Sequence, residues 1–133
     1  MNTVPQELDW VSKRATCTIG HVFNKLCNEI EGDVSTINTA RGLSEGNVFL
    51  ASMSQSGFSI VVGQSNRVPR RVAVIGIDEN RITVEQKWNG GEQWGVTVGL
   101  NDEGRCTLRL EDSTELEQWQ FRKRALEGLF FGS

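Results

Sequence analysis

The stretch RITVEQKWNGGEQWGVTVGL, residues 81–100, contains two strand patterns separated by a glycine-rich turn. On both sides of Asn89-Gly90-Gly91, β-branched and aromatic residues alternate with polar ones, as they do in half-buried strands. A connection this short joins only antiparallel neighbours. The stretch therefore predicts an antiparallel hairpin.

Similar patterns continue on both sides of this hairpin. Turn residues at 78–80 and 101–104 connect it to further β-rich runs. These runs are NVFLASMSQSGFSIVVGQ (47–64), which Ser56-Gly57 divides in two, RRVAVIGI (70–77) and RCTLRLE (105–111). We expect about five to six strands, of which the last four form an antiparallel meander.

The first forty residues predict a long helix. Thr3 is a candidate N-cap, and Gly42 is a candidate stop at the far end. The interruption Gly32-Asp33 leaves open a helix to about Glu31 followed by a second helix to about Ala40. At 100° per residue, one face collects the apolar side chains Leu8, Val11, Ala15, Ile19, Val22, Phe23, Leu26 and Ile30.

The segment STELEQWQFRKRALEGLFF, residues 113–131, predicts a C-terminal helix. Asp112 or Thr114 is the candidate N-cap. Leu116, Trp119, Leu126 and Phe130 are expected along one side. The predicted fold class is therefore α+β: a long N-terminal helix, an antiparallel meander, and a C-terminal helix packed on one sheet face. In an alternative arrangement the sheet curls round the long helix and leaves a cavity beside it.

Length and composition indicate one soluble domain spanning residues 1–133. The chain is 38% hydrophobic and 23% charged, which is ordinary for a globular protein. Neither a secretory leader nor a run long enough for a membrane helix is present in the sequence. Three cysteines at irregular spacing do not form a disulfide framework, so we expect reduced thiols and a cytoplasmic location. A net charge of −3 argues against broad electrostatic capture of nucleic acid.

The segment CTIGHVFNKLC, residues 17–27, brings two cysteines and the single histidine of the chain together. On one straight helix, Cys17, His21 and Cys27 point in directions too different to hold one ion. Cys17 and His21 could touch, but a helix interior offers no oxyanion donors. We therefore predict no metal, no cofactor and no catalytic residue here, and we interpret Cys27 as a small core residue.

A second, semi-polar stripe lies opposite the apolar face of the predicted N-terminal helix. It consists of Trp10, Cys17, His21 and Asn28. A solvated helix face rarely carries tryptophan, whereas interfaces are enriched in aromatic residues. We expect these four residues to form an interface in a homo-oligomer, with a dimer favoured.

The hairpin at 87–95, KWNGGEQWG, is a candidate ligand site. Trp88 and Trp94, with Gln93 beside them, could stack a sugar or another flat small ligand. Aromatic pairs across strands also stabilise hairpins without any ligand, and Trp88 continues a core-facing alternation.

Two basic clusters are candidate patches for an acidic partner. Arg67, Arg70 and Arg71 surround a proline between two strands, and Arg122, Lys123 and Arg124 lie on the C-terminal helix. Such runs are more often solvated surface, and the net negative charge weighs against nucleic acid.

No catalytic constellation emerges from the carboxylates, most of which lie at turns. The sequence favours a non-catalytic binding or interaction module that self-associates through its N-terminal helix. The run Leu126, Leu129, Phe130 and Phe131 could also dock on a partner. The alternative is a small-molecule-binding protein with a pocket between the sheet and the long helix, edged by Trp88 and Trp94.

Overall fold

The computed structural model describes residues 9–65 and 70–132 and has an α+β fold. In chain order the elements are α1 (Trp10–Thr16), α2 (Ile19–Ala40), β1 (Phe49–Met53), β2 (Ser59–Gln64), β3 (Val72–Asp78), β4 (Arg81–Lys87), β5 (Gln93–Leu100), β6 (Cys106–Arg109), β7 (Glu115–Leu116) and α3 (Gln118–Phe131). The expected N-cap at Thr3 lies outside the described residues.

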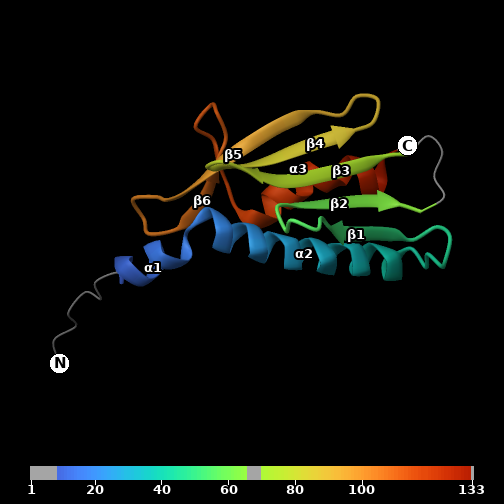
Figure 1. Cartoon of the computed structure of the whole chain (residues 1–133), viewed down its shortest axis with the longest axis horizontal. Coiled ribbons are helices and arrows are strands. Elements are labelled where there is room, and N and C mark those ends of the chain that lie inside the picture. Colours follow the sequence, from blue (N-terminus) through green and yellow to red (C-terminus); the bar gives the residue numbers. More distant parts are fainter. Residues whose placement is uncertain (1–8, 66–69, 133) are drawn as a thin grey trace.

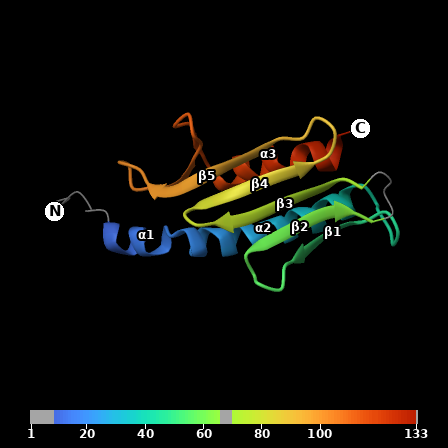
Figure 2. The same cartoon turned by 45° about the horizontal axis from the view of Figure 1, so that its top comes forward.

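The strands form one sheet in the order β1-β2-β3-β4-β5-β6-β7, and every neighbouring pair is antiparallel. Figure 2 shows this meander with β1 as an outer strand. The predicted meander of the last four expected strands is confirmed, and it extends over the whole sheet. In the β4–β5 turn, Gly90 has a φ of +84°, and the backbone of Gly91 approaches Gln86 too closely for a Cβ atom. Both positions therefore require glycine.

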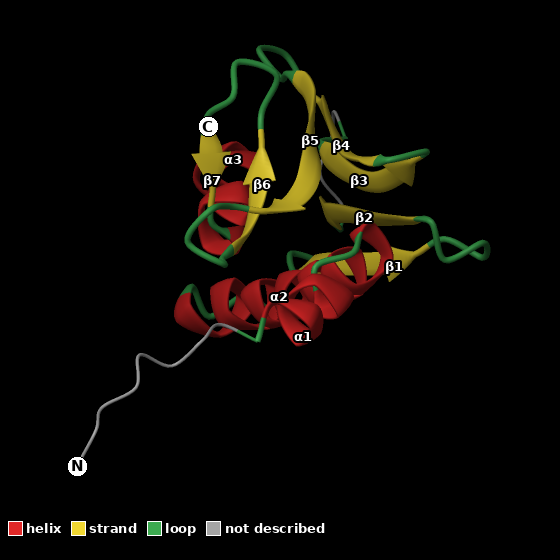
Figure 3. Ribbon diagram, turned by 90° about the vertical axis from the view of Figure 1, so that its left-hand side faces the viewer, coloured by secondary structure: helices red, strands yellow, loops and turns green. Residues whose placement is uncertain are grey.

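Both long helices cover the same face of the sheet. Helix α2 packs mainly against β1, and α3 packs against β3, β6 and β7. Figure 3 shows the sheet curling from β1 to β7, with α2 along the β1 side. The alternating strand residues facing the helices are buried, as in the Ile60/Val62, Ala73/Ile75 and Ile82/Val84 pairs. Side chains of α2, α3 and this sheet face form one hydrophobic core.

Helix α2 owes its length to a continuous apolar stripe and to a cap at each end. Its buried residues, spaced three or four apart, are Val22, Phe23, Leu26, Cys27, Ile30, Val34 and Ile37. Thr18 caps the first turn by accepting a hydrogen bond from the His21 amide. At the other end Gly42 has a φ of +61°, and the Leu43 amide donates to the Asn38 carbonyl in a Schellman-type stop. The considered interruption at Gly32-Asp33 does not occur.

The prediction of one uninterrupted rod from the start of the chain is wrong at Cys17 and Thr18. Thr18 adopts an extended conformation, which ends α1 and begins α2. Helix α1 has no buried residue, so Val11 and Ala15 do not continue the apolar stripe of α2. The break coincides with Cys17, which is 1% exposed and forms a disulfide bond with Cys106 on β6.

The C-terminal helix begins later than expected. Residues 115 and 116 pair with β6 as the short strand β7, so neither Asp112 nor Thr114 caps α3. The N-cap is Glu117, whose amide donates to the Gln120 side chain. On the helix, Leu126 and Phe130 are buried as predicted, whereas Trp119 is exposed.

The Cys17–Cys106 bond corrects the expectation that all cysteines are reduced thiols. It links the α1–α2 junction to β6 across a sequence separation of 89 residues. Cys27 is the free cysteine of the described chain, and it is buried. Disulfide bonds persist mainly in oxidising compartments and are rare in the reducing cytoplasm. The Cys17–Cys106 bond therefore gives no support to the cytoplasmic location, which stays a prediction.

Removing this bond should destabilise the fold. The variant with both Cys17→Ser and Cys106→Ser should lose about 2–4 kcal/mol of unfolding free energy, because the bond constrains a long loop of the unfolded chain. The measurement is urea denaturation with and without reductant. The wild type should respond to reductant and the double variant should not. A thiol titration of the unreduced, denatured wild type that finds three free thiols instead of one would contradict the bond.

Candidate functional site

A largely apolar groove lies between α2 and α3, and we call it the α2–α3 groove. Its volume is about 430 Å³. The apolar lining comes from Ile37 and Ala40 on α2 and from Trp119, Leu126, Phe130 and Phe131 on α3. Charged side chains also line it, namely Asp33, Arg41, Arg122, Lys123 and Glu127.

Polar bonds between the helices hold the groove open at a fixed width. Arg122 of α3 reaches α2, where its Nε donates to Asp33 Oδ2 at 2.8 Å and its Nη1 binds Glu29 Oε2. Arg41, which caps α2, donates to the Phe130 carbonyl at 2.8 Å. The two helices are therefore tied at both ends of the groove.

Two aromatic side chains of the groove are largely in solvent. Trp119 is 53% exposed and Phe131 is 69% exposed. The Trp119 indole N–H donates to Glu117 Oε2 at 2.7 Å, which orients the ring. This region includes the run Leu126, Leu129, Phe130 and Phe131, for which the sequence predicts possible docking on a partner. Leu126, Leu129 and Phe130 are buried in the core, and Phe131 is the exposed residue of the four. Sequence periodicity places Trp119 on the same side of the helix as Leu126 and Phe130, but only the latter two are buried.

The structure does not bring the predicted interface residues together as one stripe. Trp10 lies on α1, whereas His21 and Asn28 lie on α2 beyond the helix break, and all three are exposed. Cys17 cannot contribute a surface side chain because it is buried in the disulfide bond. The role of these residues in association stays a prediction, but its premise of one straight helix is wrong.

Trp88 and Trp94 do not form a cross-strand pair. The partner of Trp94 in the ladder is Val84. Trp94 packs edge-on against Phe121 with 5.1 Å between ring centroids, and Arg124 stacks on its other side at 4.6 Å. The Arg71 guanidinium lies 5.0 Å from the centre of the Trp88 ring. Both tryptophans are thus engaged by the protein itself.

These tryptophans also line separate hollows. Trp94 and the exposed Gln93 border one of about 280 Å³, and Trp88 borders another of about 560 Å³ beside Gly128. Arg124 contributes to both. Core side chains such as Phe23 and Phe49 fill the interior between the sheet and α2, where the alternative function places a pocket, and a hollow of about 360 Å³ lies at its outer edge between α2 and β1.

The basic residues are dispersed rather than gathered in one patch. Arg67 lies outside the described residues, and Arg70 is exposed. Arg71 points inward and donates to the Gly128 carbonyl at 2.9 Å. On α3, Arg122 binds two carboxylates of α2 while Lys123 pairs with Glu127. Most of these charges therefore serve contacts within the chain.

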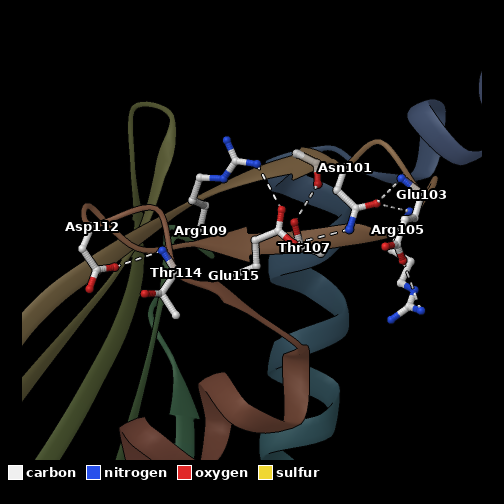
Figure 4. A network of polar contacts seen from close by, with 9 residues as sticks. Asn101, Glu103, Arg105, Thr107, Arg109, Asp112, Thr114 and Glu115 are labelled. Atoms are coloured by element: carbon white, nitrogen blue, oxygen red, sulfur yellow. Dashed lines mark hydrogen bonds and ion pairs between the residues drawn. The ribbon is translucent and has the colours of Figure 1, made fainter.

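A polar network near β6 and β7 gathers several carboxylates (Figure 4). Glu115 accepts from Arg109 at 3.1 Å and from Asn101 at 3.4 Å. The Asn101 side-chain oxygen accepts the amides of Glu103 and Arg105 across the turn. These bonds fix the β5–β6 turn and attach β7 to it. The Glu115 carboxylate is balanced by cationic and amide donors, and its hydrogen bonds and ion pair within the described chain place no second carboxylate against it for acid–base work.

The free thiol is unsuited to chemistry. Burial, and secondarily the negative charge of Glu31, raise the pKa of Cys27 to about 11. A thiol must ionise to act as a nucleophile or metal ligand, so Cys27 is inert near neutral pH. Across residues 9–65 and 70–132, no three His, Cys, Asp or Glu side chains are grouped so as to hold a metal ion.

Comparisons with known protein families, with curated protein sequences and with solved structures find no match to this chain. Among the helices of the described segments, none has the length and apolar character needed to cross a membrane. A function proposed for this protein therefore rests on the geometry of its described surface.

The Arg122 contacts predict a specific stability effect. Arg122→Met should lower the free energy of unfolding by about 1–3 kcal/mol, because Glu29 and Asp33 lose their half-buried hydrogen-bond donor. Lys123→Met is the matched control, because Lys123 makes only an exposed pair with Glu127. Urea denaturation of both variants tests this. Equal unfolding midpoints for the two would show that the contacts do not hold α3 on α2.

Proposed function

We propose that this protein binds other protein chains rather than catalysing a reaction, and that the α2–α3 groove receives an amphipathic helix of a partner. The observation that supports this most is the apolar lining of the groove together with the exposed rings of Trp119 and Phe131. Exposed aromatic residues beside an apolar hollow are a usual feature of protein interaction sites.

The shape and charge of the groove suit a helix. Along α3 the lining residues Trp119, Arg122, Leu126 and Phe130 follow helical spacing, and they span roughly 16 Å, or three turns. A partner helix with apolar residues at i, i+3, i+4 and i+7 covers about 10 Å of this length, or two of the three turns. Among the lining cations, Arg122 and Lys123 pair with carboxylates of the chain, whereas Arg41 donates to a backbone carbonyl, so an acidic residue of the partner fits best beside Arg41.

The alternative small-molecule function has weaker support. Trp88 and Trp94 border separate hollows, and each ring already contacts an arginine of the chain. The hollow at Trp94 is the smaller of the two. These features favour a structural role for both tryptophans, in packing α3 onto β4 and β5.

The groove proposal predicts binding of a designed helix. The probe is a fluorescein-labelled amphipathic peptide of about four turns, with leucines at i, i+3, i+4 and i+7 and glutamates on both flanks. Its fluorescence anisotropy should rise with wild-type protein, and Trp119→Glu should weaken binding at least about tenfold, which is about 1.4 kcal/mol.

The controls are a scrambled peptide and the Trp10→Asp variant, which changes an exposed tryptophan far from the groove. The scrambled peptide should bind wild-type protein at least about tenfold more weakly than the ordered peptide, whereas Trp10→Asp should bind the ordered peptide as the wild type does. Equal affinity for the ordered and scrambled peptides, or for all three proteins, would refute docking in the groove.

Self-association through the N-terminal helix is a second mode, supported by the exposure of Trp10 and Val11 on α1. Without a partner these two apolar side chains remain in water. If two copies associate through α1, Trp10→Asp should lower the mass found by sedimentation equilibrium at tens of micromolar. An unchanged mass for this variant would remove α1 from the interface.

A further inference from the structure

The β1–β2 hairpin is free of charge. Residues 46–66 contain no Asp, Glu, Lys, Arg or His, although charged residues make up 23% of the whole chain. At that average, about five charges would be expected in a segment of this length. Charged residues are depleted from the cores of protein interfaces, so this segment has the composition of a contact surface.

Strand β1 lies at the end of the sheet and has one free edge (Figure 2). The flanking bonds, Ser65 amide to Val48 carbonyl and Ser54 amide to Ser59 carbonyl, show that even-numbered residues of β1 bond to β2. By the alternation of antiparallel ladders, the amide and carbonyl groups of Phe49, Ala51 and Met53 point away from the sheet.

One of these three positions is already satisfied. The Asn38 side chain of α2 accepts from the Phe49 amide at 2.8 Å and donates to its carbonyl at 2.9 Å. Ala51 and Met53 have no comparable bond in the described part of the chain. The open part of the edge therefore spans only Ala51 to Met53.

This edge lacks the features that prevent strands from pairing. Monomeric proteins protect such edges with lysine, proline or a bulge, and Phe49–Met53 contains none of these. Instead Leu50 and Met53 are exposed on the strand, and Phe58 is exposed in the hairpin. A protein that kept this edge in water would risk non-specific pairing.

We propose that β1 pairs with β1 of a second copy of this chain, antiparallel and centred on Ser52. Ala51 of each copy lies opposite Met53 of the other, and each such pair exchanges two backbone hydrogen bonds. The two Ser52 residues face each other across the two-fold axis. The result is one continuous sheet through both copies, with the two α2 helices on the same face, one on each side of the joint.

A second copy fits this edge better than another strand for two reasons. The open edge is as short as a two-fold pairing centred on Ser52 requires, because Asn38 blocks the next position. A hollow of about 360 Å³ lies between α2 and β1, lined in part by Val34, Ser35 and Ala51. In the pairing, Met53 of the second copy lies beside Ala51 on the helix-facing side, where its flexible side chain can fill this hollow.

Charge placed at Ser52 tests this register. In the monomer Ser52 is exposed, so Ser52→Lys should fold normally, but in the dimer two lysines would face each other directly. Sedimentation equilibrium of the full chain should show a wild-type dimer at tens of micromolar. Ser52→Lys and Ser52→Glu should each raise the dissociation constant at least tenfold. An equimolar mixture of the two should regain the dimer, because opposite charges then meet across the axis.

Three results would overturn the proposal: a monomeric wild type at these concentrations, an unaltered mass for Ser52→Lys, or a mixture of the two variants that stays monomeric. Trp10→Asp is the comparison. If that variant alone abolishes the dimer while Ser52→Lys keeps it, the copies meet through α1. Circular dichroism and urea denaturation establish that each variant is folded. None of these measurements uses the α2–α3 groove, so the outcome is independent of the proposed binding of a partner helix.

Discussion

Phe23 of α2, Phe49 of β1 and Phe121 of α3 are almost fully buried in one hydrophobic core. They come from three parts of the chain that are far apart in sequence. An antiparallel meander has one apolar face that must be covered, and here two helices, one before and one after the sheet, share that work. The groove between them exists because both helices need the same face, whereas their own mutual contacts are few and mostly polar.

The break between α1 and α2 shows how a tertiary bond can divide a continuous helical pattern. The periodicity of apolar residues continues from Val11 to Ile19, but Cys17 is drawn to Cys106 on β6 and Thr18 becomes a cap. As a result α1 has its apolar residues in solvent, and of the two N-terminal helices only α2 joins α3 in covering the sheet. The α1 helix is thus available for contacts that the core does not use.

Local patterns were sufficient to predict six of the seven strands and the meander formed by the last four of those six, because each turn carries its own chemistry at positions such as Asn89 and Gly90. Other features depend on contacts over long separations. Nothing near Glu115 indicates that it pairs with Arg109 before α3 starts. The three irregularly spaced cysteines did not indicate a disulfide bond, because Cys17 and Cys106 come together only in the folded chain. Trp119 follows core periodicity, yet the position of α2 decides that this ring faces solvent, so the groove could not be predicted from the sequence.

The sheet is made before α3 leaves the ribosome, since α3 follows β7 along the chain. During synthesis, before α3 is made, only α2 can cover the apolar face of the sheet at β3 and β6. At that stage Glu29 and Asp33 of α2 lack their contacts with Arg122. Transiently exposed apolar surface of this kind promotes aggregation. The nascent chain is consequently most exposed to aggregation before α3 is synthesised, because α3 supplies both the remaining cover of the sheet and the Arg122 contacts.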